Sequence, residues 1–321
     1  MRRIDTASHR KPGLAPGFFL CALLAACEAP PQDKGEHLPI RFTVDARVAD
    51  ADLDEISGIA GSLRDPAVLW VHNDSGDKAR LYAVDRAGNT RGRIWLEDAD
   101  NDDWEDLAAF EHDGRAHLLV ADTGDNDARR DSVTLYAVAE PDLAVDNRVR
   151  VPPAWRVHFR YPDGPRDAEA MAIDGDRVLI LSKRDVPPVL YSVPLRVSRD
   201  EPVVAARLGP VASLPRPTRA EIDVAPMTKD WYWQPTGMTI SPRGDALVVL
   251  TYGALYYYRR AAHPDWETAL AELPLRLDLR KIPDAEAVTF VDDGRSLYVS
   301  VEAKNAPLVH IELLAEPRES Q

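Results

Sequence analysis

The feature that most constrains the fold is an internal repeat that occurs five times in the chain. Each copy begins with a polar residue, continues with small and apolar residues, and leads into a turn rich in Asp and Gly. The copies, 48 to 67 residues apart, are DEISGIAGS (54–62), DWEDLAAFEHDG (103–114), DAEAMAIDGD (167–176), QPTGMTISPRGD (234–245) and DAEAVTFVDDG (284–294). Such repeats indicate similar units that stack, because one unit cannot bury its apolar face alone.

Each copy is followed by further short apolar runs. The second runs are AVLWVHNDSG, AHLLVADTGDN, RVLILSKRD, ALVVLTYG and SLYVSVEAKN, and a Leu-Tyr pair recurs in four of the five third runs. Fourth runs such as RGRIWL and WRVHFRY complete four of the units. Short β-branched and aromatic runs between Gly, Pro and Asp turns are typical of strands. The pattern predicts an all-β fold, a single β-propeller of five four-stranded antiparallel blades.

The fifth repeat has no fourth strand of its own. The segment PIRFTVDARVAD (39–50) precedes the first repeat and is free to supply it. We therefore expect the N-terminal strand to close the ring, which leaves no open sheet edge. A sixth, irregular blade between Leu214 and Trp233 is the alternative, although that stretch has the composition of a loop. A short helix is expected within residues 261–273, with Asp265 near its start.

The N-terminus has the features of an export signal. Four basic residues precede the apolar run FFLCALLAAC (18–27), which is too short to span a bilayer as a helix. Its end, Leu24-Ala25-Ala26-Cys27, resembles the lipobox of bacterial lipoproteins, in which the Cys becomes the lipidated first residue. The expected organisation is a signal peptide (1–26), a lipid-anchored tether (27–38) and a propeller domain (39–321). A plain secretory signal peptide is the alternative.

The resemblance implies attachment to a membrane through lipid on Cys27. We expect an exported protein of the cell envelope, on the periplasmic face of the outer membrane if the cell is Gram-negative. Cys21 would be removed with the signal peptide, so the folded domain would contain no free cysteine and no disulfide.

The chain is acidic. It has 39 basic and 53 acidic residues, a net charge of −14, and loss of residues 1–26 leaves 35 against 52 and a charge of −17. A nucleic-acid partner is not expected, because backbone binding needs a basic surface. We expect a monomer whose ligand is a small anionic molecule or an envelope protein.

In a propeller the first strand of each blade lines the channel, and the second strand returns beside it. The start of the first strand and the end of the second therefore meet at one mouth. The first-strand column contains Ser57, Glu105, Glu169, Thr236 and Glu286, and two residues earlier stand Glu55, Asp103, Asp167, Gln234 and Asp284. The second-strand column contains Asn73, Asp122, Lys183, Tyr252 and Glu302, with His72, Asp74, Asp125, Asn126, Arg184 and Lys304 nearby.

Carboxylates gathered in this way must bind protons, pair with cations or hold a metal ion. Oxygen donors without cysteine favour Ca²⁺ over zinc or copper. The predicted metal ligands are Asp103, Glu105, Glu169 and Glu286. The alternative is structural, because Asp and Asn at strand ends often serve only to form turns.

Several motifs resemble those of known propellers. SGIA, WVHNDSG, DWEDLA, GDN and DAEAMA resemble a group of secreted bacterial propellers with phytase-like or esterase-like labels. QPTGMTISPRGD is similar to a strand of the gluconolactonase and senescence-marker propellers, whose first-strand Glu, Asn and Asp residues hold one divalent metal. That resemblance implies Glu105, Glu169 and Glu286 as ligands. This chain departs from the family at Thr236 and Ser57, which stand where its Asn and first Glu would be.

Two functions remain open from the sequence, and a third interpretation makes the metal purely structural, stabilising a ring whose central acids would otherwise repel one another. The first is a Ca²⁺-dependent hydrolase of a phosphoester, ester or lactone, with His72 or Asp122 handling protons. The ligand-binding residues would then be Asn73, Asp125, Lys183, Arg184, Tyr252 and Glu302. The second is a non-catalytic binding or assembly module that uses the same face for a protein or sugar. No nucleophile elbow, P-loop or zinc-protease motif decides between them.

Overall fold

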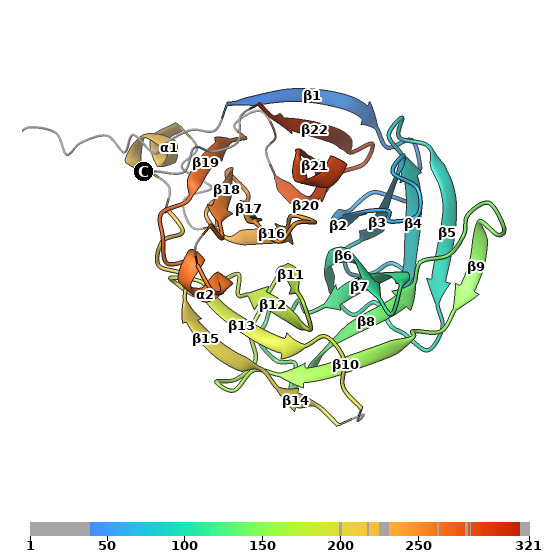
Figure 1. Ribbon diagram of the computed structural model, residues 1–321, viewed down its shortest axis with the longest axis horizontal. Helices are drawn as coiled ribbons and strands as arrows, with labels where there is room; N and C mark the ends of the chain where they lie inside the picture. Colours follow the sequence, from blue (N-terminus) through green and yellow to red (C-terminus); the bar gives the residue numbers. More distant parts are fainter. Residues whose placement is uncertain are drawn as a thin grey trace, which may run out of the picture. The chain divides into compact units, whose positions relative to one another are not determined.

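The computed structural model describes residues 39–314, apart from 199–200, 217, 225–230, 262, 280–281 and 283. The predicted signal peptide, tether and lipidated Cys27 lie outside the described residues. The described strands form five sheets arranged as a ring, so the fold is a five-bladed β-propeller, as predicted (Figure 1).

The blades share one order of strands, from the channel outward. The innermost strands are β2 (Ile56–Gly61), β6 (Trp104–His112), β11 (Ala170–Asp174), β16 (Pro235–Ile240) and β20 (Ala285–Val291). The second strands are β3 (Val68–Asn73), β7 (Arg115–Asp122), β12 (Arg177–Leu181), β17 (Ala246–Thr251) and β21 (Ser296–Val301). The third strands are β4 (Arg80–Asp85), β8 (Val133–Ala139), β13 (Val189–Pro194), β18 (Ala254–Arg259) and β22 (Pro307–Leu313). The fourth strands are β5 (Thr90–Leu96), β10 (Trp155–Arg160), β15 (Ala206–Pro210), β19 (Leu275–Asp278) and β1 (Ile40–Arg47).

The closing strand is the N-terminal one, as predicted. β1 runs antiparallel to β22, with Ile40 opposite Leu313 and Arg47 opposite Pro307. Two short strands extend other blades beyond the expected four: β9 (Arg148–Val151) lies parallel to β5, and β14 (Val203–Val204) lies parallel to β10. The described residues between Leu214 and Trp233 contain no strand, so the alternative of a sixth blade finds no support there.

Burial explains why the sequence runs look as they do. The second strands β3, β17 and β21 are buried along their whole length, because neighbouring blades cover both faces of each sheet. The outer strand β1 instead alternates between half-buried and exposed residues. Four apolar clusters fill the spaces between blades; one of them, between the first and second blades, contains Trp70, Trp104 and Leu118.

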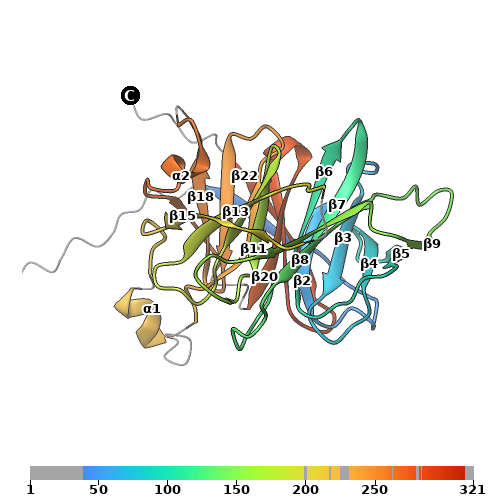
Figure 2. The same ribbon diagram turned by 90° about the horizontal axis from the view of Figure 1, so that it is seen from below.

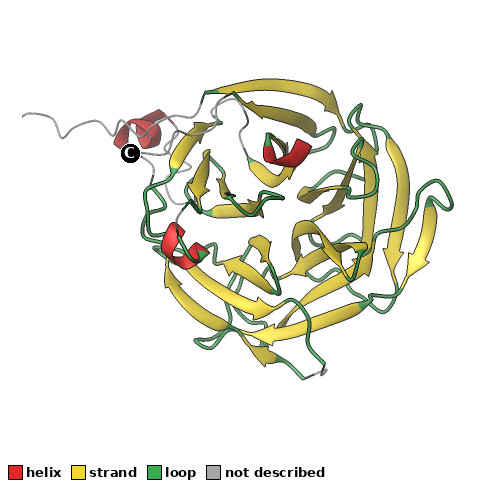
Figure 3. Cartoon of the chain, viewed as in Figure 1, coloured by secondary structure: helices red, strands yellow, loops and turns green. Residues whose placement is uncertain are grey.

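The helices are minor elements outside the inner strands. α1 (Arg219–Val224) and α2 (Trp266–Ala269) lie at the edge of the ring, and η2 (Asp292–Gly294) is a single 3-10 turn (Figure 3). α2 is shorter than the predicted segment but has the expected cap, since the Asp265 side chain accepts a hydrogen bond from Thr268 N. Among the described residues, no helix has the length and apolar character needed to cross a membrane.

One carboxylate lies where three inner strands meet. Asp106 on β6 is fully buried, and its Oδ2 accepts hydrogen bonds from the backbone N–H groups of Met171 on β11 and Met238 on β16, at 2.7 and 3.2 Å. Its Oδ1 accepts from Leu107 N at 2.8 Å. Because the acceptor belongs to one blade and two of the donors to others, Asp106 links the second, third and fourth blades across the channel.

Candidate metal centre at the mouth of the channel

The first-strand column lies at irregularities of the sheets. In four blades the register of the first two strands shifts across a column residue: Ser57, Glu105, Thr236 and Glu286. In the third blade, Glu169 directly precedes β11. A β-bulge turns a side chain out of the normal alternation, so it can direct a polar group toward the channel mouth. In side view the inner strands run along the channel, which places their starts at one end (Figure 2).

The two hydroxyl residues of the column have a structural use. Ser57 Oγ donates to the Glu105 carbonyl oxygen at 2.8 Å, and Thr236 Oγ1 donates to the Ala285 carbonyl oxygen at 2.9 Å. Each bond joins one blade to the next. Thr123 makes the same kind of link, from the second blade to Ala168 O of the third, at 2.7 Å. These links account for the positions at which the column has no acid.

Five carboxylates from three blades converge at this mouth. Asp74, Asp103 and Glu105 have ligand atoms within 4.8 Å of one another, and so do Glu105, Asp167 and Glu169. Glu105 belongs to both groups, so the two are continuous. Sequence reasoning placed Asp103, Glu105 and Glu169 among the metal ligands. It noted Asp74 and Asp167 only as neighbours of the columns.

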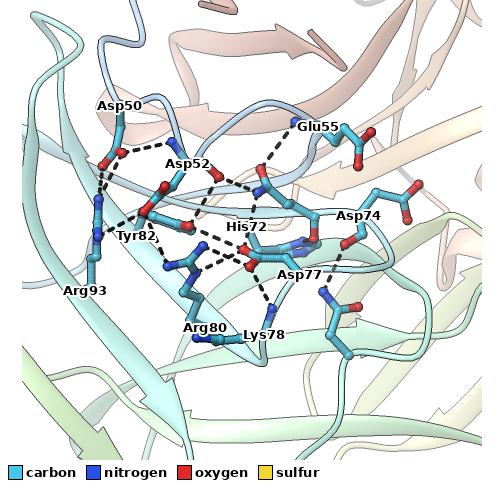
Figure 4. Close-up of polar contacts among 12 residues, drawn as sticks. Asp50, Asp52, Glu55, His72, Asp74, Asp77, Lys78, Arg80, Tyr82 and Arg93 are labelled. Carbon is cyan, nitrogen blue, oxygen red and sulfur yellow. Dashed lines mark hydrogen bonds and ion pairs between the residues drawn. The ribbon is translucent and has the colours of Figure 1, made fainter. Parts of the chain in front are cut away.

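The loop after β3 contains two acids, Asp74 and Asp77, whose contacts differ. Asp77 accepts hydrogen bonds from Arg80 Nε and Nη2, at 3.0 and 2.9 Å, and from the Tyr82 hydroxyl at 3.3 Å. Figure 4 shows this network, with Asp74 lying apart from it. Asp74 is instead fixed through its backbone, since its carbonyl oxygen accepts from Asn101 Nδ2 at 2.9 Å. The loop is thereby held in place while the Asp74 carboxylate remains at the mouth.

Gly124, in the sequence DTGDN, packs directly against two of the five carboxylates. A β-carbon at this position would stand 2.1 Å from Glu105 Oε1 and 2.5 Å from Asp103 Oδ2. The two carboxylates can therefore approach each other here only because residue 124 lacks a side chain. The carboxylates of the buried Glu105 and the half-buried Asp103 thus lie against the same backbone atom, and a bound cation would stabilise this close approach.

Burial, together with repulsion between neighbouring acids, raises the pKa values of Asp74, Asp103, Glu105 and Glu169. Burial, followed by the charges of Asp74 and Asp167, raises the pKa of Asp103 to about 7. Burial and the charge of Glu169 raise the pKa of Glu105 well above its usual range. Glu105 is 3% exposed, and the hydrogen bond that its carboxylate accepts among the described residues comes from Ser57 Oγ at 3.4 Å. A divalent cation would remove this repulsion and satisfy these oxygens.

One lysine lies among the acids. Lys183, at the end of the second strand of the third blade, forms a buried ion pair with Glu169, and its Nζ lies 5.3 Å from the centre of the Tyr252 ring. Burial alone would lower the pKa of Lys183, but the combined effects of Glu169, Tyr252 and Glu105 outweigh it and the pKa is raised, so this lysine stays protonated. Burial also raises the pKa of Glu169, although Lys183 opposes that shift.

Glu286 lies outside both carboxylate groups. Burial and the charge of Glu302 raise its pKa to about 8, while a hydrogen bond from Tyr252 opposes that shift. The predicted set of four ligands is thus divided in the structure: Asp103, Glu105 and Glu169 lie together, and Glu286 lies beside Tyr252 on the side of the fifth blade.

The DTGDN loop itself uses its acids to hold its shape. Asp122 accepts from Arg130 Nη1 at 2.8 Å and from the backbone of Asp103 at 3.1 Å. Asp125 accepts from the backbone N–H groups of Arg129 and Arg130, both at 2.8 Å. Arg184 bonds Asp167 Oδ2 through Nε at 2.7 Å and also contacts Asn126. These contacts position Asp103 and Asp167 toward the mouth.

Two other predicted site residues are used within the first blade. Asn73 donates to the Asp52 carbonyl oxygen at 2.7 Å and accepts from Glu55 N at 3.3 Å. His72 is fully buried against Trp104 and Gly58, and burial lowers its pKa to about 4. The imidazole is therefore neutral, and it does not share a ligand group with the five carboxylates.

The other end of the channel is chemically different. There the inner strands line a cavity of about 320 Å³, and most of its lining residues are apolar, although Glu111, Thr239 and Thr289 also belong to it. The apolar residues include Phe110, Ile173, Met238, Ile240 and Phe290. No residue of the predicted site lines this cavity. Asp106 and its backbone partners lie between the two ends, so the acidic mouth and the apolar cavity are separate features.

Comparison with known proteins supports the fold alone. No protein-family model matches the chain, and no curated protein matches it. Among solved structures, the Malassezia sympodialis allergen Mala s 1 has a TM-score of 0.54 at 11% identity, over 86% of this chain and 98% of that one. A nidogen/laminin complex has a TM-score of 0.43 at 13% identity, over 78% of this chain and 73% of that one.

Proposed function

We propose that this propeller binds a divalent cation, Ca²⁺, at its acidic mouth. The observation that carries the proposal is the group of five carboxylates from three blades, with Glu105 shared between its two halves. Their donor atoms are all oxygens, as Ca²⁺ prefers. The side chain of Glu105 is almost fully buried, and carboxylates in this setting need either protons or a cation.

We further propose that the bound cation supports hydrolysis of a phosphoester, ester or lactone. The ion would supply a Lewis acid that polarises a substrate oxygen and lowers the pKa of a bound water. Around it, the chain offers positive charge for an anionic group: Arg184, whose side chain is 48% exposed, and the protonated Lys183. Proton transfer falls to a carboxylate of the mouth, because the ring of His72 is buried elsewhere.

Thermal unfolding tests the cation site directly. Residues 28–321 would be melted in EDTA and then with Ca²⁺, Mg²⁺ or Mn²⁺. At a calcium concentration 100-fold above the dissociation constant, binding to the native state adds about 2.7 kcal/mol of stability. Glu105→Gln and Glu169→Gln should abolish the gain. Glu111→Gln, on the same strand as Glu105 but exposed near its far end, is the matched control. An unchanged melting curve in every metal would refute the site.

Activity is a separate measurement. A panel of phosphoesters, esters and lactones would be assayed with Ca²⁺ and with EDTA. Turnover that requires the metal and is lost in Glu105→Gln supports the hydrolase. Metal binding without turnover of any substrate class would favour a binding module instead.

One observation favours that second candidate. Trp231 and Tyr252 form an edge-to-face pair with ring centres 4.7 Å apart, and Tyr252 also faces Lys183 and Glu286. An aromatic pair beside a carboxylate mouth suits a sugar or a basic group of a protein. Titration with oligosaccharides and basic peptides, with Trp231→Ala as the variant, tests this function. It fails if no ligand binds, or if Trp231→Ala binds as tightly as the unaltered protein.

The location of the protein is also a proposal. The resemblance of residues 24–27 to a lipobox supports export and attachment to the membrane through lipid on Cys27. Expression of the full chain with a radiolabelled fatty acid tests it. Label on the wild-type chain but not on Cys27→Ala supports the anchor, and equal labelling of both would refute it.

A further inference from the structure

A second polar cavity lies on the second blade, outside the carboxylate group. It has a volume of about 250 Å³ and lies between residues 130–133, at the start of β8, and the end of β10 (Phe159 and Arg160) with the loop residues Tyr161, Pro162, Gly164 and Pro165 that follow it. The β8 and β10 ends meet here, since Val133 is opposite Phe159 in the sheet. None of the five mouth carboxylates lines it.

The cavity is lined by hydrogen-bond donors that lack partners. The hydroxyl of Tyr161 is buried and has no hydrogen-bond partner in the described part of the chain. Tyr161 as a whole is 7% exposed, so bulk water does not compensate. A buried polar group without a partner is rare in native structures, so each one calls for an explanation. Ser132 also lines the cavity, and no hydrogen bond of its hydroxyl is seen among the described residues.

Two arginines give the cavity its charge. Arg160 lines it and forms no ion pair with any residue in the described ranges. Arg130 is already paired, because Nη1 bonds Asp122 Oδ1 and the Gly124 carbonyl oxygen, both at 2.8 Å, and Nη2 lies 3.6 Å from Asp102 Oδ2. The one acid in the lining is Asp131, whose side chain is exposed. In a protein with a net charge of −14, the exposed Arg160 thus supplies the one positive charge of this lining that has no ion-pair partner among the described residues.

We propose that this cavity binds a small oxyanion, a phosphate or carboxylate group, between Arg160, Arg130 and the Tyr161 hydroxyl. The chemistry is complementary: the Arg160 guanidinium supplies charge and directed N–H donors, Arg130 adds positive charge nearby, and two hydroxyls supply the remaining hydrogen bonds. The volume suits one such group with a small substituent. The site is distinct from the proposed cation site and does not depend on it.

Calorimetric titration of residues 28–321 with inorganic phosphate and with acetate, in EDTA and at constant ionic strength, tests the proposal. We expect saturable binding with a dissociation constant in the millimolar range or tighter. Arg160→Ala should weaken binding about tenfold or more, since a charge-assisted hydrogen bond is lost. Arg115→Ala, an exposed arginine at the start of β7, removes the same charge elsewhere and should leave binding unchanged. The stronger of the two probes identifies the oxyanion.

Two further substitutions should change the affinity for the oxyanion in opposite directions. Asp131→Asn should strengthen binding, because it removes the one carboxylate of the lining. Tyr161→Phe should weaken binding several-fold without lowering the melting temperature of the free protein, because the hydroxyl it removes has no partner there. If Tyr161 served only to stabilise the fold, Tyr161→Phe would lower the melting temperature and leave binding unchanged. Absence of saturable binding by both probes, or equal binding by Arg160→Ala and Arg115→Ala, would overturn the proposal.

Discussion

The carboxylate of Glu105 lies directly against the α-carbon of Gly124, so closely that a β-carbon on residue 124 would stand 2.1 Å from Glu105 Oε1. Asp103 Oδ2 approaches the same point to 2.5 Å. Asp103 and Glu105 lie at the start of β6, and Gly124 follows the end of β7. Because the two strands are antiparallel, the three residues meet at the same end of the blade. Their close packing therefore depends on all three residues together.

Gly124→Ala should displace both carboxylates. We expect the metal-free protein to lose about 1 to 3 kcal/mol of stability, as for other overpacked sites. The calcium-dependent rise in melting temperature should be strongly reduced, because the ligand oxygens can no longer converge. Thermal unfolding in EDTA and in Ca²⁺ measures both effects. A full calcium response in this variant would mean that Glu105 and Asp103 do not bind the cation together.

The stability of the metal-free protein should fall as the pH rises. The pKa of Asp103, about 7, and that of Glu286, about 8, lie above the usual values of 3.8 and 4.5. The folded state thus binds more protons than the unfolded state, and this contribution is lost between about pH 4 and about pH 8. Melting curves in EDTA across this range measure the slope. Asp103→Asn should flatten it, and an unchanged slope in that variant would contradict the assignment.

Calcium binding should release protons near neutral pH, because a cation displaces protons from carboxyl groups with raised pKa values. The affinity should consequently increase from about pH 6 to about pH 8. Calorimetry in two buffers with different heats of ionisation measures the number of protons released. Identical heats in both buffers would show that the carboxylates are already ionised before the metal binds.

Lys183→Met should destabilise the protein by about 3 to 5 kcal/mol near pH 8, because it leaves the buried Glu169 without its ion-pair partner. The double variant Lys183→Met with Glu169→Gln should recover much of that loss, since no unpaired charge remains. Chemical denaturation of the wild type, both single variants and the double variant gives the coupling energy. Additive effects of the two substitutions would show that the pair is not coupled.

Asp106→Ala should be among the most destabilising substitutions in the channel. It removes the acceptor for three buried backbone N–H groups, those of Leu107, Met171 and Met238, each worth about 1 to 3 kcal/mol when left unpaired. Denaturant unfolding measures the loss. Glu111→Ala, at an exposed position near the end of the same strand, serves as the control. Similar stability of the two variants would mean that Asp106 does not link the blades.

The blade count and the closing strand were predictable because each blade repeats one local pattern. The fifth repeat lacks a fourth strand, and the segment before the first repeat has the alternation of an outer strand. The structure confirms both predictions. The short added strands β9 and β14 were not predicted, because Arg148–Val151 and Val203–Val204 carry too few residues for a periodic signal.

The candidate site was predictable in part. Column positions placed Asp103, Glu105 and Glu169 at one mouth, and the structure brings them together; their role as metal ligands stays a prediction. Asp106 could not be anticipated. Simple alternation directs it away from the side of Glu105 and into the blade, whereas the bulge at Glu105 changes the alternation. Tyr161 and Arg160 were missed because their cavity depends on two loops that no motif connects.

The pairing of β1 with β22 has a consequence for the order in which the protein can be assembled. β1 is the first of the described strands to leave the ribosome, whereas its partner β22 is the last. During synthesis it must therefore wait with its backbone unpaired, which is the condition under which edge strands join other chains. All residues of β1 are half-buried or exposed in the folded protein, so the unpaired strand presents little apolar surface during this delay. Ring closure would accordingly be the final and slowest event of folding, because it joins the most distant parts of the chain.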